Sequence, residues 1–154
     1  MQRSRSGFTL IELVIVIVVG SILTSIALTQ ISGAQGRVAV KGARTTYAAV
    51  QARARAHGIE MGQNVLFHVD STGDSIWIEH DGNVLEKILF RSERNVDIRI
   101  SPTGAPTSFM HCFSPRGYTD VTCNSNSSIL RIEFWQTSDS STLISLPMGQ
   151  LVLE

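Results

Sequence analysis

The sequence predicts an α+β protein, in which a long N-terminal α-helix with a hydrophobic first half packs on a mostly antiparallel β-sheet head. Two observations carry this prediction. The first 50 or so residues contain no proline and repeat their apolar residues at helical spacing, whereas the rest of the 154-residue chain breaks into short apolar runs between turn residues. The roughly 100 residues after the helix are enough for one hydrophobic core, so we expect a single head domain.

The predicted helix spans about Phe8–His57 and is about 75 Å long at 1.5 Å per residue. Its first part, residues 8–31, is mostly apolar, and Glu12 is its one charged residue. After Glu12 the chain carries no further charge before Arg37. The first part is therefore predicted to be a transmembrane or filament-core helix.

The second part of the helix, residues 32–58, is amphipathic. Its apolar stripe consists of residues three and four positions apart, namely Val40, Ala43, Tyr47, Val50 and Ala54. Because this stripe is the other large apolar surface of the chain, we expect it to cover one face of the sheet formed by residues 59–154.

The head is predicted to contain eight strands. They are Asn64–Val69, Ser75–His80, Val84–Arg91, Val96–Ile100, Phe109–Phe113, Ile129–Gln136, Leu143–Leu146 and Leu151–Leu153. Between the second and third of these, the pair Asp81-Gly82 suits a type I′ hairpin turn, because both of its central residues need a positive φ.

A short basic leader precedes the helix and ends at Gly7, followed by the stretch Phe8–Glu12. This segment resembles the type III signal of type IV pilins and pseudopilins. The resemblance implies that a prepilin peptidase in the membrane removes the leader, residues 1–7, by cutting between Gly7 and Phe8, and then methylates the new amino terminus of Phe8. It also implies that Glu12 pairs with the N-terminal amine of a neighbouring subunit.

The position of Glu12 also calls for a partner on physical grounds, because an ionised side chain at bilayer depth costs about 2.5 to 3.5 kcal/mol. One alternative is a secretory signal peptide cleaved at Ser25-Ile26-Ala27, and another is an ordinary transmembrane anchor. An acid inside the apolar core and a run longer than about 15 residues argue against the signal peptide.

One long helix followed by many short strands resembles the GspH/FimT branch of this pilin-like family, as do Phe113–Gly117 and Leu143–Glu154. The resemblance implies a minor pilin or type II secretion pseudopilin, a structural subunit that acts in filament assembly at low copy number near the tip. It implies a single-pass protein of the bacterial inner membrane, with its head in the periplasm, which then enters a pilus or pseudopilus. The expected partners are prepilin peptidase and other pilins or pseudopilins.

Charge is unevenly distributed along the chain, although 13 bases balance 13 acids. Leu13–Gly58 contains five bases and no acid, whereas Ile59–Glu154 contains twelve acids and six bases. Opposite potentials of this kind can steer subunits together. Alternatively, the helix bases form only a solvated face.

A pilus-associated receptor for DNA or a surface is the alternative function. DNA binding needs bases that neutralise phosphates, and the acidic head opposes it unless four arginines gather on one face: Arg91, Arg94, Arg99 and Arg116. Some relatives bind DNA with a basic tail, but Met148–Glu154 contains no base. We therefore expect that nucleic acid is not a partner.

Cys112 and Cys123 lie in a head that the signal would export, so a disulfide is the simplest interpretation. Closing a loop of this size contributes about 2 to 3 kcal/mol. A metal site with His111 and both cysteines is the alternative, but it lacks a fourth ligand at recognisable spacing. The chain contains no phosphate-binding Gly-rich loop, nucleophile elbow or HExxH motif, so we expect no enzymatic activity, cofactor or metal.

Overall fold

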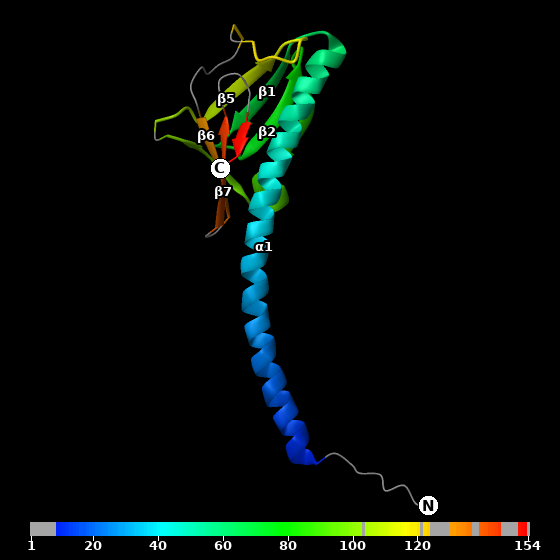
Figure 1. Ribbon diagram of the computed structural model, residues 1–154, viewed down its shortest axis with the longest axis vertical. Coiled ribbons are helices and arrows are strands. Elements are labelled where there is room, and N and C mark those ends of the chain that lie inside the picture. Colours follow the sequence, from blue (N-terminus) through cyan, green and yellow to red (C-terminus); the bar gives the residue numbers. More distant parts are fainter. Residues whose placement is uncertain are drawn as a thin grey trace, which may run out of the picture. The chain divides into compact units, whose positions relative to one another are not determined.

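The computed structural model describes residues 9–102, 104–120, 122–123, 130–136, 139–145 and 151–153, with the backbone alone for residues 27–34 and 153. The chain divides into two compact units, Met1–Gln35 and Gly36–Glu154, and each is described by itself. Helix α1, Leu10–Met61, contributes to both units (Figure 1). The described part of the second unit adds eight strands and one short helix.

Helix α1 begins directly after Thr9, which caps it. The Glu12 N–H donates to Thr9 O at 3.1 Å and to Thr9 Oγ1 at 3.3 Å. The helix ends at Met61, before Gly62 with a φ of +65°, a conformation that favours glycine at a helix C-terminus. The predicted end at His57 is therefore too early, because the helix continues through Gly58 and stops only at Gly62.

The strands form two four-stranded antiparallel sheets rather than the single sheet that was expected. The first has the order β3-β2-β1-β5 and the second has the order β4-β6-β7-β8. The bounds are β1 Val65–Asp70, β2 Ser75–His80, β3 Asn83–Leu89, β4 Asp97–Ser101, β5 Ser108–Phe113, β6 Leu130–Gln136, β7 Asp139–Ser145 and β8 Leu151–Leu153. The turn between β2 and β3 confirms the predicted type I′ geometry, with φ of +49° at Asp81 and +77° at Gly82.

One predicted strand is partly replaced by helix. The run Val84–Arg91 was expected to be extended, but β3 ends at Leu89 and Phe90–Arg94 forms the short helix α2. Phe90 is fully buried in the core, and its N–H donates to Asp74 O at 2.9 Å. Anchoring of this side chain pulls the backbone out of the strand, an effect that local composition does not reveal.

Another strand is longer than predicted at its start. The run Leu143–Leu146 was chosen for its apolar residues, but β7 begins at Asp139, and the polar stretch before Leu143 pairs with β6. Backbone pairing with β6 holds that stretch in the sheet without apolar side chains. Leu146, like Ile129 at the start of the predicted sixth strand, lies outside the described residues.

The hydrophobic core of the second unit lies between α1 and both sheets. All five residues of the predicted apolar stripe are buried. The Tyr47 ring lies 5.3 Å from the Phe67 ring of β1 and 5.8 Å from the Phe134 ring of β6, in edge-to-face contacts. Figure 1 shows this part of α1 lying along the sheet that contains β1 and β2. The stripe therefore joins the helix to both sheets.

Candidate functional site

The first half of α1 presents apolar side chains in every direction. Its exposed large apolar residues are Leu10, Ile11, Leu13, Val14, Ile15, Val16, Ile17, Val18, Val19, Ile22, Leu23 and Ile26. Seven of these are consecutive, from Leu13 to Val19, so no face of this helical segment is polar. None of the described helices has the combined length and hydropathy that a membrane crossing requires.

Glu12 lies in the first turn of this apolar segment. Its N–H bonds to Thr9 Oγ1, so Thr9 and Glu12 have the spacing of a capping box, and the carboxylate lies where the helix dipole favours negative charge. The side chain is exposed and forms no ion pair among the described residues. The expected cleavage and methylation residues, Gly7 and Phe8, lie outside the described residues.

The Thr-x-x-Glu cap was missed by the sequence analysis, although its signal is present. A Ser or Thr followed three residues later by Glu, just before an apolar run, predicts a helix start. Thr9 and Glu12 satisfy this pattern, so the sequence alone could have placed the first helical residue at Leu10. Glu12 therefore has a structural role in its own chain, through its backbone, in addition to the role implied for its carboxylate.

Two of the five bases in the second half of α1 pair with acids of the same chain. Arg53 donates to both carboxylate oxygens of Glu86 on β3, at 2.9 and 2.6 Å, and this hydrogen bonding raises the pKa of Arg53. Arg37 Nε lies 3.5 Å from Asp139 Oδ1 at the start of β7. The charge difference between helix and head thus serves, at these two positions, to hold the helix on its own head.

Arg91, one of the four candidate DNA contacts, belongs to an ion-pair network. Its guanidinium lies 2.9 Å from Asp74 Oδ2 and 3.0 Å from Asp97 Oδ1, and the hydrogen bond to Asp97, followed by the charge of Asp74, raises the pKa of Arg91. Asp74 is buried and accepts a hydrogen bond from the Ile98 N–H at 2.6 Å. This network links α2 to the loop before β2 and to β4.

Of the other three candidate arginines, Arg94 and Arg116 lie far apart. Arg94 on α2 reaches α1 at Gly42, where a Cβ atom would lie 3.4 Å from its Nη1. Arg99 on β4 stacks over the Trp135 ring at 4.5 Å. Arg116 precedes Gly117, which packs against Ile59, and Gly42 and Ile59 are about 25 Å apart along the helix axis. The four arginines therefore do not form one basic face.

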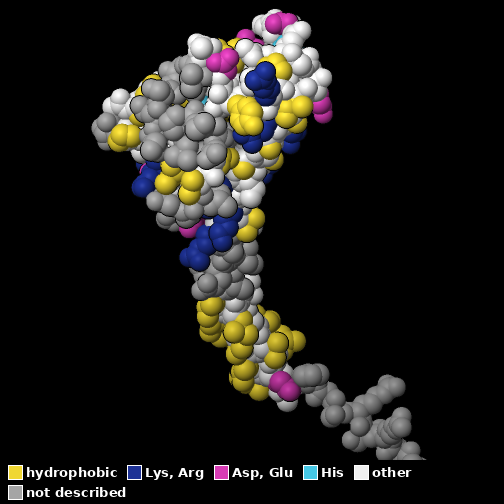
Figure 2. All heavy atoms as spheres, turned by 45° about the horizontal axis from the view of Figure 1, so that its top comes forward, with side chains coloured by type: hydrophobic (Ala, Val, Ile, Leu, Met, Phe, Trp, Pro, Cys, Tyr) yellow, Lys and Arg dark blue, Asp and Glu magenta, His cyan; other side chains and the backbone are white. Residues whose placement is uncertain are grey.

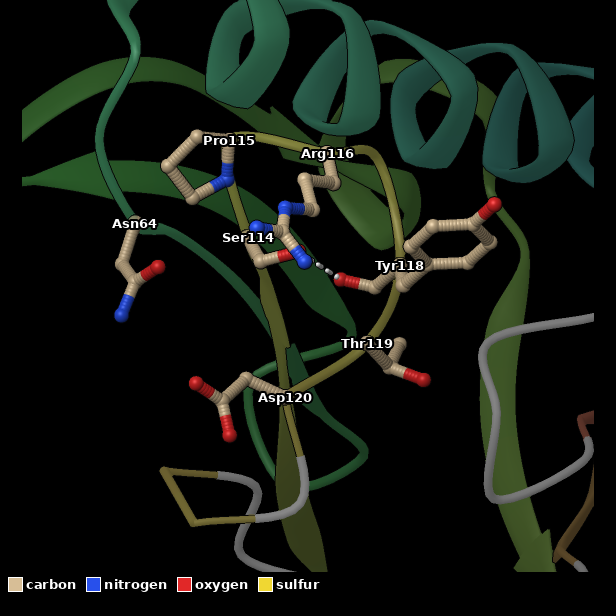
Figure 3. Close-up of a pocket in the computed structure, with 7 residues that line it drawn as sticks. All are labelled: Asn64, Ser114, Pro115, Arg116, Tyr118, Thr119 and Asp120. Carbon is tan, nitrogen blue, oxygen red and sulfur yellow. Dashed lines mark hydrogen bonds between the residues drawn. The ribbon is translucent and has the colours of Figure 1, made fainter.

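Arg116 lines a pocket of about 450 Å³ in the loop after β5, together with Asn64, Ser114, Pro115, Tyr118, Thr119 and Asp120 (Figure 3). Several polar groups of this loop form hydrogen bonds with other groups of the same loop. The Ser114 hydroxyl donates to Tyr118 O at 2.9 Å, and hydrogen bonds from the Thr122 hydroxyl and N–H lower the pKa of Asp120. This pocket holds no arrangement of a nucleophile with a base.

The disulfide expected between Cys112 and Cys123 is present and closes this loop. The alternative metal site is wrong, because the disulfide uses both sulfur ligands and His111 Nε2 instead lies 2.9 Å from Ser145 Oγ of β7. Within the described part of the chain, no other group of histidine, cysteine and acidic residues could hold a metal ion.

A family model described as the prokaryotic N-terminal methylation motif matches residues 2–28. Among solved structures, the chain is similar to the type IV minor pilin FimU of Pseudomonas aeruginosa, with 16% identity over 75% of this chain and 87% of that chain, and a TM-score of 0.52. A second crystal form of FimU gives 14% identity, 74% and 91% coverage, and a TM-score of 0.50.

The minor pseudopilin EpsH from the type 2 secretion system of Vibrio cholerae is also similar, with 10% identity, 73% and 93% coverage, and a TM-score of 0.47. Curated proteins give no match. The predicted α+β, pilin-like fold is confirmed by the likeness to FimU. The chain therefore joins the N-terminal methylation motif of type IV pilins to the fold of a type IV minor pilin.

Proposed function

We propose that this protein is a minor pilin or pseudopilin of the GspH/FimT type, a structural subunit of a type IV pilus or a type II secretion pseudopilus. One observation carries the proposal: residues 10–26 expose apolar side chains on every side of α1, inside the segment that matches the methylation motif. A helix that is apolar all round needs lipid or other helices around it. A bundle of such helices in a filament core supplies that surrounding.

The same helix supports a membrane stage before assembly. We propose that residues 8–31 anchor the protein in the bacterial inner membrane, with the head in the periplasm, while prepilin peptidase cuts between Gly7 and Phe8 and methylates Phe8. The subunit then moves from lipid into the filament, where the apolar surface meets equivalent helices. The likeness to a minor pilin supports a low-copy component, which we place near the filament tip.

Glu12 is proposed to set the position of the subunit along the filament. Its backbone N–H donates a hydrogen bond to Thr9 Oγ1, while its exposed carboxylate can accept a partner from a neighbouring subunit. Cleavage before Phe8 creates one positive amine per subunit. Pairing of this amine with Glu12 of a neighbour offsets the cost of placing each charge among apolar helices.

The alternative function, a receptor for DNA, has less support. Arg91 is engaged with Asp74 and Asp97, and the positions of Arg94 and Arg116 lie about 25 Å apart along α1. Binding to a phosphate backbone needs several bases in a row along one groove. We therefore propose a structural subunit rather than a nucleic-acid receptor.

The experiment that tests the proposal is mass spectrometry of filaments sheared from cells. A peptide that begins at N-methylated Phe8, recovered with pilins, supports a pilus subunit. Recovery beside secretion components in the inner membrane supports the pseudopilus. A mature terminus at Leu28, or an uncut Met1, would contradict the proposal.

A charge-matched pair of variants separates the role of Glu12 from a general effect of removing an acid. Glu12→Gln is expected to remove the protein from the filament fraction while leaving the cut before Phe8 intact. Glu60→Gln, at the other end of the same helix, is expected to leave incorporation unchanged. Equal incorporation of both variants would show that the Glu12 carboxylate has no part in assembly.

A further inference from the structure

A cluster of three bases, Arg37, Lys41 and Arg44, lies on α1 at one end of the head unit, and we refer to it as the basic cluster. Arg37, Lys41 and Arg44 are four and three residues apart on α1, so they share one face of the helix. In Figure 2, dark blue Lys and Arg side chains gather over the part of α1 at the lower end of the head.

A hollow of about 330 Å³ lies beside the basic cluster, between α1 and β7. Its walls come from Arg37, Val40 and Lys41 of the helix and from Asp139, Ser140 and Ser141 of the strand. Arg44 Nη1 donates to Ser141 Oγ at 3.4 Å, which places a third base at its edge. Cationic side chains next to hydroxyl groups are the donors that hold a phosphate group.

One acid, Asp139, is the counter-charge in this hollow. Its carboxylate lies 3.5 Å from Arg37 and packs so closely on the helix that a Cβ on Gly36 would lie 2.6 Å from its Oδ2. Because Gly36 has no side chain, the Asp139 carboxylate can pack against the backbone of α1 on one side of the hollow. Among the described residues that line the hollow, two exposed bases, Arg37 and Lys41, face this one acid, which leaves a positive excess.

The position of the basic cluster in the chain identifies the source of the phosphate. Arg37 follows the apolar stretch 8–31 by only six residues in the sequence, and six residues span at most about 20 Å in any backbone conformation. The polar headgroup layer is roughly 5 to 8 Å thick on each side of a bilayer. Long basic side chains and a screening length of about 8 Å extend the reach of these bases towards an anionic surface.

We propose that the basic cluster binds the phosphate of anionic phospholipid headgroups and holds the subunit at the membrane surface before assembly. This inference rests on the proposed function, because it takes residues 8–31 as the membrane anchor. Entry into a filament then requires the basic cluster to release its lipids, so lipid binding and assembly compete for the same subunit.

The test is native mass spectrometry of the full chain released from detergent micelles that contain either phosphatidylglycerol or phosphatidylcholine. The variant Arg37→Gln/Lys41→Gln removes two charges of the basic cluster, and Arg99→Gln/Arg116→Gln removes two charges elsewhere on the head. We expect the unaltered chain to retain about tenfold more phosphatidylglycerol than phosphatidylcholine. The preference should disappear in the first variant and persist in the second.

Equal retention by both variants, or no preference in the unaltered chain, would overturn the inference. A dimer peak that disappears only in Arg37→Gln/Lys41→Gln, without a lipid preference, would assign the basic cluster to a second copy. Near-ultraviolet circular dichroism shows whether each variant keeps the fold of the head. Fractionation of cells tests the proposed function separately. A chain that is found in membranes but lacks a lipid preference contradicts only this inference. A chain that is absent from membranes contradicts the proposed function as well.

Discussion

The two halves of helix α1 carry similar apolar side chains in opposite surroundings. Val16 in the first half exposes 63% of its surface, whereas Val50 in the second half exposes none. The second half is covered by its own head through Tyr47, which touches Phe67 and Phe134. The first half belongs to a different compact unit and has no such cover among the described residues.

This difference separates two uses of hydrophobicity in one helix. Burial of the stripe stabilises the head, because about 25 cal/mol is gained for each Å² of apolar surface removed from water. The exposed half contributes no such free energy until lipid or another helix covers its apolar surface. Substitutions should therefore act on folding in one half and on assembly in the other.

The largest expected effect is the loss of Tyr47. Tyr47→Ala should lower the free energy of unfolding by about 3 to 5 kcal/mol, because it leaves a cavity where the Tyr47 ring contacts Phe67 and Phe134 of the two sheets. The Tyr47 hydroxyl has no hydrogen-bond partner among the described residues, so this loss is one of packing. Urea unfolding of the detergent-solubilised chain, followed by tryptophan fluorescence, measures it. Tyr118→Ala is the control, since Tyr118 is exposed and the change should stay within about 0.5 kcal/mol.

A matched pair of valines compares the two halves directly. Val50→Ala should cost about 2 kcal/mol, from two lost methyl groups and a small cavity, whereas Val16→Ala should change the unfolding of the head by less than about 0.5 kcal/mol. The same urea titration gives both values. Equal losses would break the comparison, because they would mean that the first half of α1 also supports the head.

A matched pair of glycines gives a second comparison of the two halves of α1. At Gly58 a Cβ would lie 3.2 Å from the backbone oxygens of Phe113 and Ser114, whereas at Gly20 a Cβ would meet no described atom within 4 Å beyond its chain neighbours and the adjacent helix backbone. Alanine gains about 1 kcal/mol over glycine in a helix, but this crowding should turn the gain at Gly58 into a loss of about 1 kcal/mol. Thermal unfolding of Gly58→Ala and Gly20→Ala distinguishes the two positions. A stabilised Gly58→Ala variant would show that the loop after β5 yields easily.

The smallest expected effect concerns pH. His68 of β1 stacks on Trp77 at 4.6 Å and lies 3.3 Å from Glu79, and burial lowers the pKa of His68 although the charge of Glu79 opposes this shift. The folded state therefore binds a proton less readily than the unfolded state. Stability should fall as the pH drops through the ordinary histidine value of about 6.5 towards the lower pKa of the folded state.

Melting temperatures at about pH 7.5 and about pH 5 test this, with His68→Gln expected to show a smaller decrease than the unaltered chain. His57→Gln, near the C-terminal end of α1, controls for the loss of an imidazole. An unchanged decrease in His68→Gln would assign the acid sensitivity of the head to other groups.

Local patterns predicted a large part of this fold. The spacing from Val40 to Ala54 identified the buried face of α1, and Asp81-Gly82 identified a hairpin turn. Such features depend on residues close together in the chain, where backbone preferences and side-chain periodicity act directly. The cysteines also indicated their disulfide, since the exported head left few other uses for them.

Charge pairing is where the sequence was least informative. The uneven charge suggested contacts between subunits, but Arg53 pairs with Glu86 and Arg37 with Asp139 within one chain. The four candidate arginines are likewise distributed by the fold, with Arg91 drawn into the network of Asp74. These pairs join residues that are far apart in sequence, so they depend on strand order and register.

Local sequence patterns predict the N-terminal methylation motif, the apolar and amphipathic halves of α1, its buried stripe and the strand-rich head. Three other features follow from tertiary packing: the division of the strands into two sheets, the change from β3 to α2 at Phe90, and the pairing of each acid with its base. The two groups of features differ in how far apart in the sequence the interacting residues lie. Helix periodicity and turn chemistry are set by neighbours within a few residues, whereas sheet partition, core anchoring and ion pairing follow from which distant surfaces pack together.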